Sequence, residues 1–414
     1  MKLAIKKSSI IQYALIYLLI CFQGSMGFRA YYNVFLIIAI VAAALVFLQK
    51  RRSVPQHYIV FLMALFLLLL YEIVLTDGGL ELSSIISIMA RFLIVMAAYY
   101  YDTEFFADRF VKMVVFLAIV SLFGFILSLT VPTIIKALLT TRTETVTNYW
   151  QSYNVEYYGT FLYAFTNATV RNIGIFHEPG LYQIVLNASL YILLFKRNAL
   201  CITNRKWNTY CVVIIVTLVT TMSTTGLLGM IGLLVIYVLF AKEDNALSPK
   251  VKYCLVLGLV IFGVYCFFAD ADSFINKYVL SKIMQEGKID FSSSTGNSRI
   301  MSMMSDLAIF REHIFGIGYL KYNAAFMDNL LDKTIADTSS CVGFTQVLAI
   351  LGILVFLTIV LYYAFLIRRN MNRAEAMAFL FIFVNTGLGQ PYIWFPALVV
   401  LLLLKKNEVY YAYK

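Results

Sequence analysis

The sequence predicts an all-α integral membrane protein, a single polytopic domain (1–414) of about 12 transmembrane helices with two large extracytoplasmic loops. Composition, recurring apolar stretches and the distribution of basic residues support this prediction. The 414 residues are 61% hydrophobic and 13% charged, whereas soluble domains average about 45–50% apolar and ~25% charged residues. The net charge of +11 would suggest nucleic acid in a soluble protein. Cytoplasmic basic residues explain it better in a membrane protein, so we expect no nucleic-acid partner.

Each predicted span is an apolar stretch near the ~20 residues that cross the hydrocarbon core. No small-x-small cleavage site follows the first stretch, which favours an uncleaved helix over a signal peptide. The apolar blocks 208–241 and 375–404 are too long for one crossing, and polar, glycine-bearing bends at 223–226 and 387–391 predict a hairpin in each. The spans cover residues 10–26, 32–49, 57–75, 83–100, 109–130, 178–196, 208–222, 226–241, 252–269, 341–367, 375–388 and 391–404.

Basic residues orient this bundle. If the N-terminus is cytoplasmic, most of the 33 Lys and Arg residues fall in cytoplasmic segments, and the short outer turns carry only Arg29. Cytoplasmic loops are the ones enriched in Lys and Arg, so both termini are predicted to be cytoplasmic. The two long outer loops, 131–177 and 270–340, then hold most of the polar chemistry.

Cysteines and acidic residues give no cofactor site. The six cysteines form no close pairs, which indicates neither a disulfide framework nor a zinc site. Asp270 and Asp272 form a D-x-D pair that could hold a divalent metal on a sugar diphosphate, but acids at helix ends are common. We expect no metal and no cofactor.

The first outer loop ends in Arg171-Asn-Ile-Gly-Ile-Phe-His177-Glu178-Pro179-Gly180. Pro179 suits the first turn of a helix, and helix N-termini attract anions. Arg171 and that helix end would together make a phosphate or diphosphate site near the outer membrane interface. A solvated interfacial loop is the alternative interpretation. The aromatic residues between 149 and 163 in the same loop could stack on sugars or populate an interfacial belt.

The second outer loop contains Arg299 and an amphipathic stretch. Its apolar side chains share one helical face: Ile300, Met303, Met304, Leu307 and Ile314. This spacing predicts a helix that lies on the membrane surface or caps the bundle. Arg311 falls within the stripe, where it would snorkel or point at an anionic group. His313 falls outside it and could act as a general base, although a surface histidine is more often a bystander.

Arg91 lies in the middle of a predicted span. A cation there costs at least ~2.5 kcal/mol, so such a residue usually faces the bundle interior and has a partner. Glu72 is a candidate partner. A structural ion pair and a substrate-facing arginine are both open.

In chain order, three motifs resemble those of the O-antigen polymerase and ligase superfamily. Residues 171–180 look like its R-x-x-G-x-F-x-E-P-G/N signature, and Ser223-Thr-Thr-Gly226 resembles its hairpin bend S-x-S/T-R/G. Arg299, followed by Phe315-Gly-Ile-Gly318, resembles its R-x(n)-P/F-x-G-x-G element. The resemblance covers most of residues 110–370. The chain is more similar to Wzy-type repeat-unit polymerases than to ligases, because its second loop lacks a ligase-like His-x-His or His-Asn pattern.

The resemblance implies a GT-C-like polytopic glycosyltransferase of the bacterial inner membrane. It would polymerise undecaprenyl-diphosphate-linked oligosaccharides at the outer face into O-antigen or capsular polysaccharide. Its partners would be this lipid-linked substrate, the bilayer and, in some systems, a chain-length regulator protein. The main candidates for binding the diphosphate of the substrate would be Arg171 and Arg299. Arg311 and Arg91 would be secondary candidates. The acceptor proton would go to Glu178 as first choice, or to His313 or His177.

Three rival functions are open. A lipid-linked oligosaccharide flippase would have short loops and charged residues lining a cavity within its spans, whereas here the intramembrane charges are few and the outer loops are long. The ligase that attaches polysaccharide to the lipid A core is the second rival. The third is a non-catalytic scaffold or chain-length partner, which would not need arginines at the outer interface.

Overall fold

Eleven of the twelve predicted apolar stretches are helices in the computed structural model, which describes residues 7–50, 53–147, 152–167, 170–240, 284–285, 288–289, 294–330 and 340–406. These helices are α1 (Lys7–Cys21), α3 (Tyr32–Lys50), α4 (Gln56–Leu75), α5 (Leu82–Tyr101), α6 (Phe106–Thr130), α8 (Pro179–Phe195), α9 (Asn204–Thr221), α10 (Thr224–Phe240), α15 (Gly343–Asn370), α16 (Arg373–Gly387) and α17 (Pro396–Leu403). The stretch at 252–269, and the D-x-D pair after it, lie outside the described residues.

Within the described part of the chain, five helices are long and apolar enough to cross a membrane: α3, α4, α5, α6 and α15. Helices α8 and α10 and most of α1 are apolar over shorter lengths. Large hydrophobic side chains such as Leu48, Phe123 and Leu361 are more than half exposed on these helices, as contact with lipid requires. These features are those of a multi-pass integral membrane protein. The count of twelve crossings remains a prediction.

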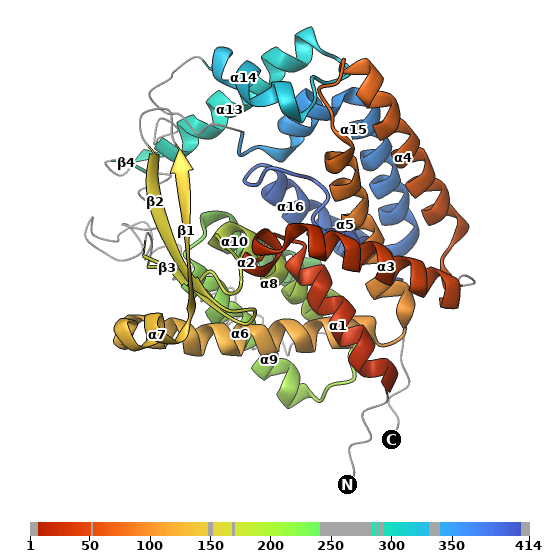
Figure 1. The fold of residues 1–414 in the computed structure, drawn as a ribbon. Coiled ribbons are helices and arrows are strands. Elements are labelled where there is room, and N and C mark those ends of the chain that lie inside the picture. The colour runs from red at the N-terminus through yellow and green to blue at the C-terminus, as the bar shows by residue number, and fades with distance from the viewer. Residues whose placement is uncertain are drawn as a thin grey trace.

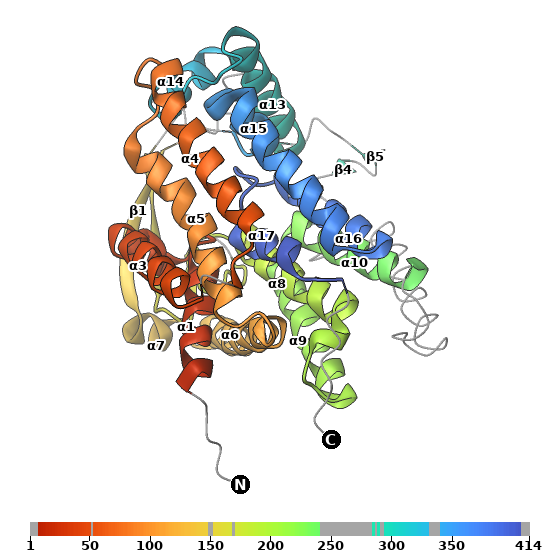
Figure 2. The same cartoon turned by 90° about the vertical axis from the view of Figure 1, so that its right-hand side faces the viewer.

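Helix α8 lies at the centre of the bundle, and it contacts α6, α9, α10, α16 and α17 (Figures 1 and 2). Its residues 181–194 are all buried, as expected for a helix that is apolar around its whole circumference. Three polar side chains, those of Gln183, Asn187 and Ser189, interrupt this apolar surface. Asn187 donates to the side chain of Gln183 and to the carbonyl of Gly226 at the start of α10. This second bond ties the middle of α8 to the start of α10.

The first outer loop contains a β-sheet, so the all-α prediction is wrong there. After the short helix α7 (Pro132–Leu138), strands β1 (Thr140–Thr147), β2 (Ser152–Gly159) and β3 (Ala164–Thr166) form an antiparallel sheet in the order β1-β2-β3. Thr140 pairs with Gly159, and Tyr157 pairs with Thr166. Alternate threonines in β1 favour a strand because β-branched side chains fit a pleated surface. Short strands β4 (Met284–Gln285) and β5 (Lys288–Ile289) form a second pair.

The amphipathic stretch of the second loop is a helix, α13 (Ser294–Glu312), followed by α14 (Tyr319–Asp328). The polar face of α13 is the buried one. On this face, Asp306 accepts hydrogen bonds from Tyr322 on α14 (2.6 Å) and from Thr345 on α15 (2.7 Å). Burial raises the pKa of Asp306 to about 6. Its apolar stripe, including Ile300, Met304 and Leu307, is exposed. An exposed apolar stripe is compatible with the predicted position on the membrane surface.

Helix α15 is interrupted at Gly352, whose φ of 67° and ψ of −177° are not helical. The segment between α13 and α14 fills the interruption. The N–H groups of Ile317 and Gly318 donate to the carbonyls of Ala349 (3.0 Å) and Ile350 (2.9 Å), and the N–H of Ile353 donates to Ile314 (2.9 Å). Backbone polar groups at membrane depth must find protein partners. The glycine-rich motif 315–318 supplies them to the broken helix.

In several contacts, both partners belong to segments that the sequence predicts on the same side of the membrane. Among the predicted cytoplasmic segments, Lys196 pairs with Glu375 (3.0 Å), and Cys201 donates its N–H to Asp108 (3.1 Å). Among the outer segments, the short helix α2 (Met26–Ala30) bonds through its first residue to the carbonyl of Ile175 (2.9 Å). The topology that the charges predict is compatible with these contacts.

Candidate active site

Arg171 lies at the bend between α9 and α10. Its Nη2 donates to the carbonyl oxygen of Met222 at 2.9 Å. Met222 ends α9 in the left-handed conformation (φ 47°), which is uncommon for a residue other than glycine. The guanidinium of Arg171 is partly buried, and burial lowers its pKa, although it stays protonated at neutral pH. Arg171 therefore brings a positive charge beneath the protein surface.

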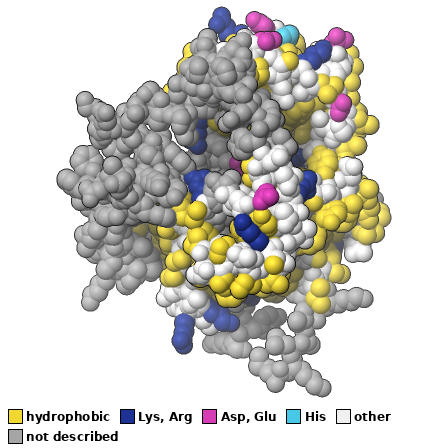
Figure 3. Space-filling model, turned by 60° about the vertical axis from the view of Figure 1, so that its left-hand side comes forward, with side chains coloured by type: hydrophobic (Ala, Val, Ile, Leu, Met, Phe, Trp, Pro, Cys, Tyr) yellow, Lys and Arg dark blue, Asp and Glu magenta, His cyan; other side chains and the backbone are white. Residues whose placement is uncertain are grey.

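Arg299 reaches the same bend from the second outer loop. Its Nη2 lies 3.4 Å from Oγ1 of Thr225, three residues after Met222. Two arginines from loops far apart in the sequence thus contact one four-residue bend. Figure 3 shows basic side chains around a hollow on the face of the molecule that it presents.

The bend also forms the N-terminus of α10, a helix of 17 residues. Unpaired N–H groups and the helix dipole attract anions at such an end. The hydroxyl of Thr224 is buried there, and among the described residues it has no hydrogen-bond partner. A buried polar atom without a partner is rare and points to a missing ligand or water. The two guanidinium groups, the helix end and this hydroxyl suit an anion with several oxygen atoms.

The second predicted bend, at 387–391, packs against the first. Asn385 donates to the carbonyl of Thr225 at 2.7 Å. A Cβ atom at Gly389 would lie 2.8 Å from Oγ1 of Thr225 and 3.3 Å from Nη2 of Arg299. Gly389 is therefore the position at which this bend comes close to the arginine.

We expect Gly389→Ala to lower activity about tenfold while the protein stays folded. The added methyl group must displace Thr225 or Arg299, and small displacements of positioning groups are costly for catalysis. The activity of purified protein would be compared with its thermal unfolding midpoint. Gly78→Ala is the control, since no atom lies within 4 Å of its Cβ position. Unchanged turnover for Gly389→Ala would contradict the expectation.

Glu178 is the N-cap residue of α8, and its side chain makes no capping hydrogen bond. Instead, the side chain of Gln390 hydrogen-bonds to it, and Arg29 and Arg171 are close enough to stabilise its charge. Burial is the larger effect and raises the pKa of Glu178 above its ordinary value. A carboxylate with a raised pKa is a better proton acceptor near neutrality.

His177 has a structural environment. Its Nδ1 lies 3.0 Å from the carbonyl oxygen of Gly24, so Nδ1 carries the proton. Burial and the charge of Arg29 lower its pKa to about 4. Phe176 beside it forms an isolated β-bridge with Ser25. His177 holds the turn after α1 against the entrance of α8, and its low basicity makes it a poor general base.

Arg29 was missed as a site residue in the sequence, although it is the only basic residue of the short outer turns. It lies on α2 and pairs with Glu144 of β1 at 3.1 Å. Arg142 approaches the same carboxylate at 3.3 Å. Arg29 therefore links the β-sheet to the surroundings of Glu178. Its isolation among neutral turn residues was the signal that could have identified it.

Arg91 faces the interior, but not toward Glu72. Its Nη1 donates to the hydroxyl of Ser87 at 2.8 Å, and its guanidinium lies 6.0 Å from the ring of Phe28 and 5.4 Å from that of Tyr392. Glu72, the candidate partner, does not pair with Arg91, since no ion pair joins the two among the described residues. The carboxylate of Glu72 is buried without a hydrogen-bond partner there. Aromatic rings stabilise Arg91 instead.

The structure does not bring Arg311 and His313 to Arg299. All three lie along or just after α13, and a rise of 1.5 Å per residue separates His313 from Arg299 by about 20 Å. Arg311 and His313 are exposed. No group of three or more His, Cys, Asp or Glu side chains in the described ranges could hold a metal ion.

Residues 209–360 match a protein-family model described as O-antigen ligase. The matched part is just over a third of the chain, and it includes the bend at 222–225, Arg299 and the interruption of α15. The match supports the resemblance to the O-antigen ligase and polymerase superfamily, and with it a role in polysaccharide assembly. It does not distinguish a polymerase from a ligase. No curated protein matches the chain.

Proposed function

We propose that this protein polymerises undecaprenyl-diphosphate-linked oligosaccharide repeat units at the outer face of the bacterial inner membrane. The observation that carries the proposal is the approach of Arg171 and Arg299 to one bend at the N-terminus of α10. Arginine suits a diphosphate because its planar fork donates two hydrogen bonds at once. The product would be O-antigen or capsular polysaccharide.

The site would act mainly on the leaving group. An acceptor hydroxyl attacks C1 of the lipid-linked sugar, the bond from C1 to the diphosphate oxygen breaks, and the lipid diphosphate leaves with its additional negative charge. Guanidinium groups that bind the leaving diphosphate more tightly as this charge develops lower the barrier. The acceptor proton would go to the carboxylate of Glu178, which is more basic than His177.

The polyprenyl tail has an apolar surface beside this site. Helix α10 begins at the bend, and Leu228, Val235 and Leu239 along it are exposed. A lipid whose diphosphate sits at the N-terminus of α10 could run along this face into the bilayer. Helix α8, whose residues 181–194 are all buried, offers no comparable surface.

The ligase is the second candidate, because the matching family model carries that description and does not separate the two reactions. A ligase would use the same lipid-linked donor and differ in its acceptor. The arginines would serve both reactions, so the decision rests on the product.

The surface polysaccharide of a strain lacking this protein would separate the functions. A single repeat attached to the lipid core indicates a polymerase, because ligation continues without chain growth. Long lipid-linked polymer with no sugar on the core indicates a ligase. Single repeats trapped on the cytoplasmic face indicate a flippase. Complementation with the wild-type chain should restore the ladder, and the double variant Arg171→Ala/Arg299→Ala should not; either of the other two profiles would refute the polymerase.

A further inference from the structure

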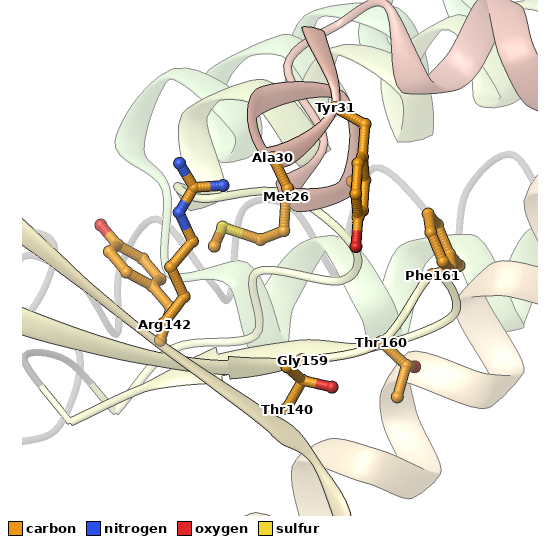
Figure 4. Close-up of a pocket in the computed structure, with 10 residues that line it drawn as sticks. Met26, Ala30, Tyr31, Thr140, Arg142, Gly159, Thr160 and Phe161 are labelled. Atoms are coloured by element: carbon orange, nitrogen blue, oxygen red, sulfur yellow. The ribbon is translucent and has the colours of Figure 1, made fainter. Parts of the chain in front are cut away.

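A cavity of about 250 Å³ lies between α2 and the β-sheet of the first outer loop. Figure 4 shows the rings of Tyr31 and Phe161 at one end and the guanidinium of Arg142 at the other. The hydroxyl-bearing residues Thr140 and Thr160 line the strand side. The cavity therefore combines aromatic rings with hydrogen-bonding groups, and its volume suits a single sugar ring.

The two aromatic rings are arranged as a platform. Their centroids are 6.2 Å apart and their planes differ by 23°. Tyr31 is 56% exposed and Phe161 is 52% exposed, so both present a free surface. The backbone fixes the platform, because a Cβ at Gly27 would lie 2.9 Å from the ring of Phe161. Ring faces of this kind pack against the C–H groups of sugars, and cavities with a few placed polar groups select their ligands.

A chain of charges connects this cavity to the candidate active site. Arg142 approaches Glu144 at 3.3 Å, and Glu144 pairs with Arg29 at 3.1 Å. The positive charge of Arg29 in turn stabilises the ionised form of Glu178. A saccharide in the cavity would thus lie next to a group of charges, Arg142, Glu144 and Arg29, of which Arg29 acts electrostatically on the proposed proton acceptor.

We propose that this cavity is a saccharide subsite that holds a sugar ring of the oligosaccharide repeat unit, stacked on Tyr31 and Phe161 and hydrogen-bonded to Arg142. The proposal rests on the polymerase function for the identity of the ligand. A lipid tail is the other occupant that aromatic rings would accept. It would leave the guanidinium of Arg142 and two hydroxyl groups facing hydrocarbon, which is costly.

The test measures binding in the absence of turnover. The probe is the oligosaccharide released by mild acid from the surface polysaccharide of the producing strain, free of lipid and diphosphate. Its binding to the full chain in nanodiscs would be followed by saturation-transfer NMR. We expect Tyr31→Ala and Phe161→Ala to bind about tenfold more weakly, and Tyr31→Phe to bind like the wild type. Tyr71→Ala is the matched control, since Tyr71 is 54% exposed on α4 and does not line the cavity.

Two further measurements keep the outcome decisive. If either alanine variant fails to fold, Gly27→Ala tests the same platform by displacing Phe161. Arg171→Ala should keep full glycan binding while losing turnover, so a failure of the proposed function would appear there and not in the binding assay. Wild-type glycan affinity in folded Tyr31→Ala and Phe161→Ala proteins would overturn the subsite. Loss of bound lipid with unchanged glycan affinity would overturn it as well.

Discussion

Replacing Arg299 with alanine should lower the turnover of lipid-linked substrate about 10²–10³-fold, the usual cost of removing one donor that stabilises transition-state charge. Its Nη2 lies at Thr225, beside the end of α10 where the proposed diphosphate binds. Arg171→Ala should have a similar effect from the other side of the bend. Polymer formation by purified protein in vesicles, with product length and initial rate recorded, measures both.

Two variants on the same helix sharpen this prediction. Arg299→Lys keeps the charge but loses the planar fork, so activity should recover only in part. Arg311→Ala removes an exposed cation from the far end of α13 and should leave the rate near that of the wild type. Equal losses in Arg299→Ala and Arg311→Ala would mean that general positive charge, and not a positioned guanidinium, supports the reaction.

Gly352→Ala should destabilise the protein by at least about 3 kcal/mol and sharply reduce the yield of folded material. Its φ of 67° and ψ of −177° fall in a region that is essentially restricted to glycine. An added Cβ would lie 2.2 Å from the carbonyl carbon of Phe315, so the segment that fills the break in α15 could not dock. Monodisperse yield and the thermal unfolding midpoint measure the effect.

Gly78→Ala separates the two causes. Gly78 also has a positive φ of 72°, but a Cβ there would meet no atom within 4 Å. The Gly78→Ala variant should therefore lose only roughly 1 kcal/mol of stability, the cost of the backbone strain alone. If both variants lose the same stability, the contact with Phe315 contributes nothing and this account of the break is wrong.

The helices could be predicted because apolar length alone identifies them, and the bends because polar, glycine-bearing residues interrupt two long apolar blocks. The sheet of the first loop was missed: its alternate threonines are a local strand signal, but the apolar composition of the chain favoured helices throughout. Arg171 and Arg299 stood out through their motifs. Their approach to one bend depends on how α9, α10 and α13 pack, which no local pattern encodes.

Packing against other elements decided two features that the local sequence does not encode, one on α13 and one at Arg91. Helical spacing identified the apolar stripe of α13, but the partners on α14 and α15 select which face is buried. Tyr322 and Thr345 supply hydroxyl groups to Asp306, so the polar face packs inward. In the same way, the sequence suggests Glu72 as an acidic partner for Arg91. In the folded protein, Arg91 contacts the rings of Phe28 and Tyr392.

The break in α15 also has a consequence for the order of assembly. Ribosomal synthesis proceeds from the N-terminus, so residues 314–318 exist before residues 349–353 do. When the later segment emerges, the amide donors that its carbonyls need are already part of the polypeptide. The protein from residue 340 onward can thus use an earlier segment as a template, and the helix that contains Gly352 can acquire its bent shape as it is made.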